Sequence, residues 1–256
     1  MLSKLIFTIL TAALLTFAGT TTSMADLVDG CGNGPGICDG TGDGDGNRYG
    51  HNYGDENGIK DGSCIVDEDG ISTASTGLTP EEIEWLLFTR EEEKLARDSY
   101  LVLGALWELA IFDNIAVAEQ KHMDAMKKLL DCYKLTDPVI DELGTFTDPA
   151  LQTMFDFLMV QGTQTVMDGL YAGALIEETD IKSLQDAIIA TVHTDIASTY
   201  ESLMCGSRNH LRAFVRQIEI NGGSYTPTVL TENEGAEFWA IAHSDMEQDC
   251  GKNKKG

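Results

Sequence analysis

The sequence is poor in basic residues, with 17 lysines and arginines against 42 aspartates and glutamates, and its formal net charge is −25. A field of that sign repels phosphate backbones and anionic lipid. The composition therefore argues against a nucleic-acid-binding protein and against a membrane-surface protein. Cations are the natural partners of such a chain, although part of the charge also serves solubility.

Motifs for thiolate metal sites, membrane spans and β-strands are missing as well. No C-x-x-C pair occurs, so the chain lacks the motif of a zinc knot or a rubredoxin-type iron site. No apolar stretch reaches the roughly 20 residues that a membrane-spanning helix needs. Strand-like alternation of apolar and polar residues is almost absent, which makes an all-α protein the expectation.

The first 25 residues have the features of a signal peptide. Lys4 supplies the positive charge, segment 5–18 is largely apolar, and 23–25 resembles a cleavage site with small residues. We therefore expect cleavage near Ala25 and export of the chain to the periplasm or the cell exterior. All six cysteines then lie in the mature chain, where disulfides can form. Their pairing cannot be deduced from the sequence, although Cys31 and Cys38 are close enough for a local bridge.

Residues 26–77 differ in composition from the rest and hold 14 of the 26 glycines. This segment offers too little apolar surface for a compact fold, so we expect an irregular Gly/Asp-rich leader. Oxygen-bearing side chains at every second position, in 39–47, suit calcium. However, an EF-hand loop counted from Asp39 places Gly50 where the bidentate glutamate belongs. A solvated acidic linker is therefore favoured over a calcium site.

From Leu78 onward the apolar residues follow a helical period. Thr79-Pro80-Glu81-Glu82 is a typical helix start, with a capping hydroxyl, a proline and two acids. A link with two prolines, about 136–149, separates the second helix from the third. The pattern predicts a helical bundle over 78–222 and a C-terminal extension over 223–256. The expected helices span about 80–107, 112–133, 149–178 with an interruption near Gly162, 180–191, 194–220 and 234–246.

Four of these helices carry a carboxylate or an imidazole on the face whose other residues are apolar. Glu93, for example, shares its face with Leu86 and Tyr100, seven residues away on either side. The second helix has a Glu-x-x-His pair on its apolar face. The residues in question are Glu93 on the first helix, Glu119 and His122 on the second, Glu177 and Asp180 on the third, and His210 on the fourth.

Buried carboxylates that converge need a cation, because several like charges cannot all stay ionised away from water. Glu-x-x-His on one helix with a glutamate from a neighbour is how helical bundles hold two iron or manganese ions. The alternative is a structural network of ion pairs, with Lys94, Arg97 and Arg212 as counter-ions. The coincidence on four helices favours the metal centre.

The motifs also resemble known families. Residues 93–100 are similar to the first-helix Glu-x-x-Ala-Arg-x-x-Tyr of rubrerythrins, and 115–122 resemble their second-helix segment ending in Glu-x-x-His. The wider region, about 79–221, resembles an exported ferritin-like family catalogued as domain of unknown function 2202. Its hallmarks are the motifs at 90–98, 174–178 and 207–211.

The resemblance implies a ferritin-like four-helix bundle with a long crossover, and a di-iron centre that reduces peroxide. It implies Glu93, Glu119, His122, Glu177 and His210 as metal ligands, with Asp180 at the spacing of a second third-helix acid. One position departs from the family pattern, because Ser207 stands where the fourth helix should have a glutamate. Glu178, Asp180 or Glu201 would have to replace that ligand. The fused rubredoxin domain is also absent, so the electron donor is unidentified.

Two functions follow from these observations. The first is an exported di-iron or di-manganese oxidoreductase acting on peroxide or dioxygen, with two irons per chain. The second is a non-catalytic metal-binding or structural secreted protein, for which zinc is as suitable as iron or manganese. Metal ions are the expected partners in both, and the sequence leaves a homodimer open.

Overall fold

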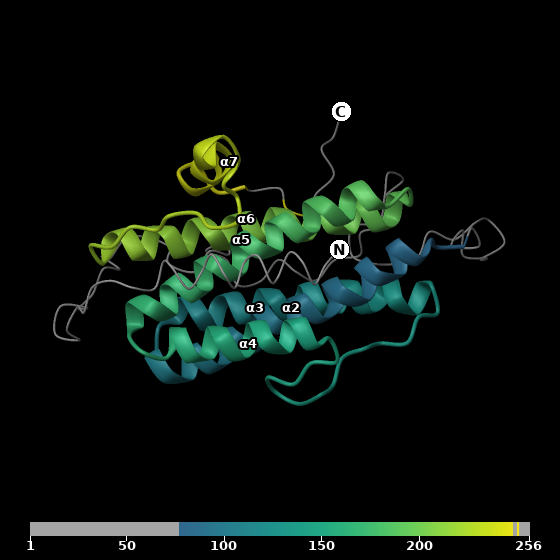
Figure 1. The fold of residues 1–256 in the computed structure, drawn as a ribbon, viewed down its shortest axis with the longest axis horizontal. Coiled ribbons are helices and arrows are strands. Elements are labelled where there is room, and N and C mark those ends of the chain that lie inside the picture. The colour runs from purple at the N-terminus through teal and green to yellow at the C-terminus, as the bar shows by residue number, and fades with distance from the viewer. Residues whose placement is uncertain (1–76, 248–249, 251–256) are drawn as a thin grey trace, which may run out of the picture.

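The computed structural model describes residues 77–247 and Cys250 of the chain (Figure 1). The predicted signal peptide and the predicted leader, up to residue 76, lie outside the described residues. So do the calcium site and the Cys31–Cys38 bridge that the sequence left as alternatives. The described part contains six helices and no strand, which confirms the all-α class. The helices are α2 (Pro80–Trp107), α3 (Ala110–Cys132), α4 (Pro149–Gly162), α5 (Val166–Ala190), α6 (Thr194–Ile220) and α7 (Glu232–Ala242).

Four long helices form the bundle. Helix α2 packs along α3, α5 packs along α6, and the two pairs meet through α2–α5 and α3–α6 (Figure 1). The start of α2 lies at the end of α5, because Glu82 accepts a hydrogen bond from the backbone of Val192. The end of α2 lies near the start of α5, where Trp107 donates to the carbonyl of Gly162. Helices α2 and α5 are therefore antiparallel, and α3 and α5 run in the same direction. A long crossover, which consists of residues 133–148, helix α4 and residues 163–165, joins α3 to α5, as predicted. None of the described helices is long and apolar enough to cross a membrane.

The first helix begins where the sequence predicted. The Thr79 hydroxyl accepts a hydrogen bond from the Glu82 backbone at 3.2 Å, and the Glu82 carboxylate accepts one from the Thr79 backbone at 2.8 Å. Pro80 occupies the first helical position, where its missing N–H costs nothing. This reciprocal capping box fixes the register of α2.

The prediction was wrong between Glu178 and Asp180, where we expected one helix to end and a short one to begin. Helix α5 instead runs unbroken from Val166 to Ala190. The acids Glu177, Glu178 and Asp180 at this point are all buried within α5, where other segments of the chain contact them. Smaller differences are that α3 begins two residues earlier than predicted and that α7 ends at Ala242.

Charged side chains of α2 hold the crossover in place. Lys94 is fully buried, pairs with Asp98, and donates to the carbonyls of Glu142 and Thr145 at 2.9 and 3.2 Å. Asp98 in turn accepts a hydrogen bond from the Gly144 backbone at 2.9 Å. A buried lysine that also serves two backbone carbonyls ties the middle of the crossover to the centre of α2.

Two neighbours of Lys94 extend this contact along the crossover. The Arg90 guanidinium contacts both carboxylate oxygens of Asp137, with an Nη2–Oδ2 distance of 3.0 Å. The Glu91 carboxylate accepts hydrogen bonds from the backbones of Thr147 and Asp148 at 2.7 and 3.0 Å. We call these four residues of α2 the crossover clamp: Arg90, Glu91, Lys94 and Asp98.

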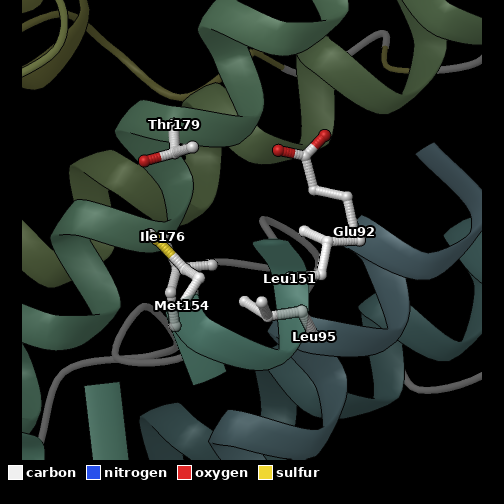
Figure 2. Close-up of a pocket in the computed structure, with 6 residues that line it drawn as sticks. All are labelled: Glu92, Leu95, Leu151, Met154, Ile176 and Thr179. Carbon is white, nitrogen blue, oxygen red and sulfur yellow. The ribbon is translucent and has the colours of Figure 1, made fainter. Parts of the chain in front are cut away.

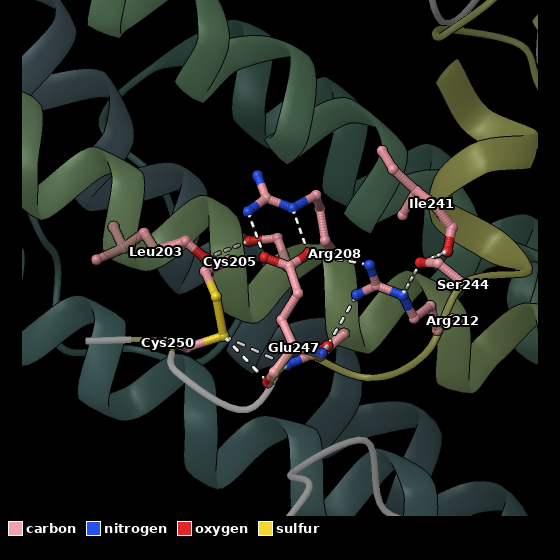
Figure 3. A network of polar contacts seen from close by, with 10 residues as sticks. Leu203, Cys205, Arg208, Arg212, Ile241, Ser244, Glu247 and Cys250 are labelled. Atoms are coloured by element: carbon pink, nitrogen blue, oxygen red, sulfur yellow. Dashed lines mark hydrogen bonds and ion pairs between the residues drawn. A yellow bond between two sulfur atoms is a disulfide. The ribbon is translucent and has the colours of Figure 1, made fainter. Parts of the chain in front are cut away.

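The C-terminal segment is fastened to α6. A disulfide joins Cys205 to Cys250, which confirms the prediction that cysteines form structural bridges. Cys132 is also disulfide-bonded. Arg208 and Arg212 both contact the Glu247 carboxylate, and Figure 3 shows the two guanidinium groups converging on it beside the disulfide. These contacts cover the outside of the α6 turns that carry Ser207 and His210.

Candidate metal centre

Five of the six predicted ligands converge inside the bundle, and all four bundle helices contribute. They form two groups of three that share Glu119, and within each group the ligand atoms lie within 4.8 Å of one another. The first group is Glu93, Glu119 and His122, and the second is Glu119, Glu177 and His210.

Glu119 lies between the two imidazoles. Its Oε2 is 2.8 Å from Nδ1 of His122, and its Oε1 is 2.8 Å from Nδ1 of His210. The two rings are stacked with their centroids 5.7 Å apart. One carboxylate thus offers one oxygen to each group, which is the arrangement of a carboxylate that bridges two ions.

Each group is completed by an outer glutamate. Glu93 Oε2 lies 3.1 Å from His122 Nδ1, and Glu177 Oε2 lies 3.4 Å from His210 Nδ1. The Tyr100 hydroxyl donates to the other oxygen of Glu177. The Tyr100 ring packs against two phenylalanines, Phe112 and Phe214, and so holds Glu177 at a fixed position.

Several polar atoms of the centre are buried without a hydrogen-bond partner. They include Glu93 Oε1, Glu119 Oε1 and His210 Nδ1. The last two lie 2.8 Å apart, yet their geometry is not that of a hydrogen bond. Buried polar atoms are nearly always satisfied, so these donor atoms fit a metal ion that each of them would coordinate.

The electrostatics of the centre also call for cations. Burial opposes a charge on Glu119, but the neighbouring His122 and His210 hold the pKa of its carboxyl well below the usual range. Burial alone would lower the pKa of His210, yet Glu119 and Glu177 raise it to about 10. At Glu93 burial prevails and raises the pKa to about 8. Without a metal, the site therefore holds protons in the place of cations.

Asp180, the sixth predicted ligand, belongs to neither group. Its Oδ2 accepts a hydrogen bond from the Ser207 hydroxyl, and its Oδ1 is buried without a partner. The other two replacements considered for the missing glutamate lie elsewhere. The Glu178 carboxylate accepts hydrogen bonds from the backbone of 228–230, and Glu201 is exposed. Asp180 is therefore the carboxylate that stands beside Ser207.

The lysine and the arginines that we expected as counter-ions do not form ion pairs with the ligands of the centre. Lys94 and Arg97 contact Asp98, and Arg212 contacts Glu247. Among the described residues, no ion pair joins a lysine or arginine to the five converging ligands. The alternative of a network neutralised by lysine and arginine is therefore not supported at this centre.

Sequence reasoning missed Gly206. A Cβ at this position would lie 2.7 Å from Nε2 and 2.9 Å from Cε1 of His122. The His122 ring can lie against α6 only because residue 206 has no side chain. An isolated glycine inside a helical pattern gives no sign of which ring approaches it, so the sequence carried no usable signal.

Fold and site together define the class of the molecule, a four-helix bundle whose interior holds two histidine–carboxylate groups joined by a shared glutamate. Residues 82–244 match the family described as an uncharacterized protein domain (DUF2202), and the chain belongs to this family. It is similar to the uncharacterized protein MJ0754 of Methanocaldococcus jannaschii, with 47% identity over 162 residues, 63% of this chain and 88% of that protein. The crystal structure of hypothetical protein MJ0754 from Methanococcus jannaschii DSM 2661 is also similar, with a TM-score of 0.65 and 44% identity. The match covers 67% of this chain and 97% of that one.

Proposed function

We propose that this protein binds two iron or manganese ions and acts as an exported oxidoreductase on peroxide or dioxygen. The observation that carries the proposal is the position of Glu119, which offers one oxygen to each of two histidine–carboxylate groups. A structural ion-pair network has no need of such a shared ligand. If two ions bind, Glu119 would be a ligand to both, and its negative charge would reduce their mutual repulsion.

The ligand types support iron or manganese. Both groups consist of carboxylates and one imidazole, and neither contains a thiolate. Carboxylate suits manganese, imidazole suits iron and zinc, and mixed carboxylate–histidine sites in bundles hold iron or manganese pairs. Zinc fits the same donor atoms, so the identity of the metal is part of the experiment.

The small number of protein ligands favours a catalytic metal site over a closed structural site. Each group has three protein ligands and shares one of them, which leaves coordination positions open. Two adjacent metals would supply a template and a Lewis acid for breaking an O–O bond. The chain itself orients the outer carboxylate through Tyr100, and the rings of Phe112 and Phe214 exclude water behind it.

One observation favours the second function, a metal-binding protein without catalysis. Four of the five ligand side chains are at most 3% exposed, and only His122, at 14%, reaches toward solvent. A centre enclosed to this degree suits storage or stabilisation of the fold.

Metal analysis separates the two functions. The protein is purified without chelator, and its metals are quantified together with its optical spectrum before and after peroxide. About two irons or manganese ions per chain, with a spectrum that peroxide changes, support the oxidoreductase. One ion per chain, or zinc alone, supports the non-catalytic protein. A chain that takes up no metal after reconstitution refutes both. Export is tested separately, by locating the protein in its own cells and determining the N-terminus of the isolated form.

A further inference from the structure

Helix α3 ends at Cys132, whose disulfide partner lies in the leader. The bridge between Cys205 and Cys250 uses two of the six cysteines, and Cys132 is bonded as well. Within the chain three candidate partners remain, and all of them precede the described residues. They are Cys31, Cys38 and Cys64. The bond therefore joins the end of α3 to a point in the leader.

Cys132 ends α3 at the end of the bundle where α2 begins, which is on the right in Figure 1. The hydroxyl of the next residue, Tyr133, donates to the Asp195 carboxylate at 3.0 Å, and the Tyr133 ring contacts that of His193. The His193 imidazole in turn contacts Glu82 in the capping box of α2. The end of α3, the start of α2 and the turn between α5 and α6 are therefore neighbours.

Two large apolar side chains are exposed at this end. Ile189, in the last turn of α5, is 83% exposed, and Val192, in the turn between α5 and α6, is 85% exposed. The Val192 backbone donates to Glu82 at 3.2 Å, which places this turn beside the start of α2. They are the most exposed large apolar residues in the part of the chain that the structure describes. We call Ile189 and Val192 the apolar tip.

The pocket between α2, α4 and α5 is not an alternative place for a leader segment. Figure 2 shows the side chains that enclose it, and each of them is at most 5% exposed. They are Glu92, Leu95, Leu151, Met154, Ile176 and Thr179. A segment from outside would have to move helices to enter this pocket, whereas the apolar tip is open to solvent.

We infer that Cys64 is the partner of Cys132 and that residues 65–76 cross this end of the bundle and cover the apolar tip. The inference does not depend on the proposed metal centre. The bond forms when the two thiols pass two electrons and two protons to a disulfide oxidant, which is thereby reduced to two thiols. Oxidising compartments outside the cytosol supply oxidants of this class.

The length of the chain favours Cys64 over the other two cysteines. Cys31 and Cys38 are close enough in the sequence to bridge each other, and Cys64 lies 13 residues before Gly77. A bond from Cys64 also closes the shortest loop that Cys132 can close, at the lowest cost in chain entropy. Helices α2 and α3 pack side by side, roughly 10 Å apart. Because 13 residues can reach about 45 Å, the segment is long enough to pass over the apolar tip on its way to α2.

The composition of segment 65–76 suits this position. It begins with an isoleucine and a valine, continues with three acids and contains one more isoleucine. The apolar residues match the apolar tip, which leaves water when it is covered. The acids follow closely after Cys64, and Lys128 is exposed one turn before Cys132 on the same face of α3. Charge and apolarity are thus complementary on the two sides of the contact.

Disulfide mapping tests the bond. The protein is produced in a bacterial periplasm, alkylated without reduction and digested with trypsin. Trypsin leaves Cys64 on peptide 61–90 and Cys132 on peptide 129–134, and the other two leader cysteines stay together on a peptide that ends at Arg48. We expect 61–90 joined to 129–134. A bond from 129–134 to the peptide that ends at Arg48, or an alkylated Cys132, overturns the inference.

A protease that cleaves after glutamate tests the cover. Segment 65–76 contains one such site, Glu68, and the leader contains another, Glu56, outside this segment. We expect cleavage after Glu68 to be about tenfold slower, or more, in the wild type than in Cys64→Ser/Cys132→Ser. Cleavage after Glu56 should be similar in both, and circular dichroism checks that the double variant keeps its helices. Equal rates after Glu68 overturn the cover.

Val192→Ser keeps the disulfide and removes half of the apolar tip. We expect it to speed cleavage after Glu68, because less apolar surface holds the segment in place. Val160→Ser is the matched control, since it makes the same change at an exposed valine of α4. It should be cleaved as slowly as the wild type. No acceleration in Val192→Ser, or equal acceleration in both variants, overturns the placement on the apolar tip.

Discussion

Glu119 Oε1 and His210 Nδ1 lie 2.8 Å apart across the interface of α3 and α6 without forming a hydrogen bond. On its other side, Glu119 Oε2 is equally close to His122. Removal of this one carboxylate should therefore affect both metal groups, whereas removal of one imidazole should affect one.

We expect Glu119→Ala to lose both metal ions and His122→Ala to lose one of the two. The reason is that Glu119 belongs to both groups and His122 only to the first. Elemental analysis of the purified variants measures the number of ions per chain. Asp124→Asn is the control, because Asp124 is an exposed acid on the same helix. Equal metal loss in both alanine variants would contradict the two-group arrangement.

Metal affinity should rise with pH. Burial opposes a charge on His122, but Glu119 and Glu93 raise its pKa well above the usual value, and the pKa of His210 rises to about 10. Both imidazoles are therefore protonated in the metal-free protein at neutral pH, and a metal must displace these protons. We expect the affinity to increase about tenfold per pH unit for each proton displaced. Titrations in weak buffer should also show proton release, and a pH-independent affinity would contradict this protonation state.

Gly206→Ala should weaken metal binding without unfolding the protein. The new Cβ would lie 2.7 Å from Nε2 of His122, so the ring must move. Alanine itself favours the helix by about 1 kcal/mol over glycine. We expect metal affinity of the first group to fall roughly 10–100-fold, the range seen when residues that orient ligands are changed. Circular dichroism checks that helicity is kept, while metal titration measures the loss.

The sequence predicted the centre more accurately than its surroundings. Three consecutive glutamates on α2 point in different directions: Glu91 to the crossover, Glu92 to Ser183 and Glu93 to the ligands. Helical periodicity selects Glu93, because it alone shares a face with Leu86 and Tyr100. The roles of the other two depend on contacts with residues more than 50 positions away, which periodicity cannot reveal.

The same limit explains the error in α5. Residues 172–181 of α5 are all buried, so no alternation of exposed and buried residues shows in the sequence that the helix continues through Glu178 and Asp180. The pairing of Ser207 with Asp180 was out of reach for a similar reason, because it joins two helices at a register that the sequence does not state.

Lys94→Met should destabilise the protein substantially. The variant leaves Asp98 buried with Arg97 as its remaining ion-pair partner and leaves two crossover carbonyls without their donor. Loss of one member of a buried pair costs about 3 kcal/mol or more. Urea denaturation of the metal-free protein measures the free energy of unfolding. A change below about 1 kcal/mol would show that the crossover clamp contributes little.

Glu82 should contribute stability that acid removes. Burial opposes its ionisation, but hydrogen bonds from Thr79, His193 and Thr191 lower the pKa of its carboxyl from 4.5 to about 2. Because the folded-state pKa lies below the unfolded one, the stabilisation is complete above pH 4.5 and is lost as the pH falls toward 2. We expect Glu82→Gln to cost about 1–2 kcal/mol at pH 7 and less at pH 3. Unfolding curves at the two pH values test this, and an equal cost at both would rule out the carboxylate charge as its source.

The partners of α2 have a consequence for biosynthesis. Among them are Thr191, which is 109 residues after Glu82, and Glu177, which is 77 residues after Tyr100. The first bundle helix to leave the ribosome is thus completed by segments that are translated much later. In a nascent chain that has not yet produced α6, Glu93, Glu119 and Glu177 would have to converge without His210, which opposes folding at that stage. We expect folding to be delayed until nearly the whole chain has been translated, so that truncated chains become substrates for proteolysis rather than partly active products.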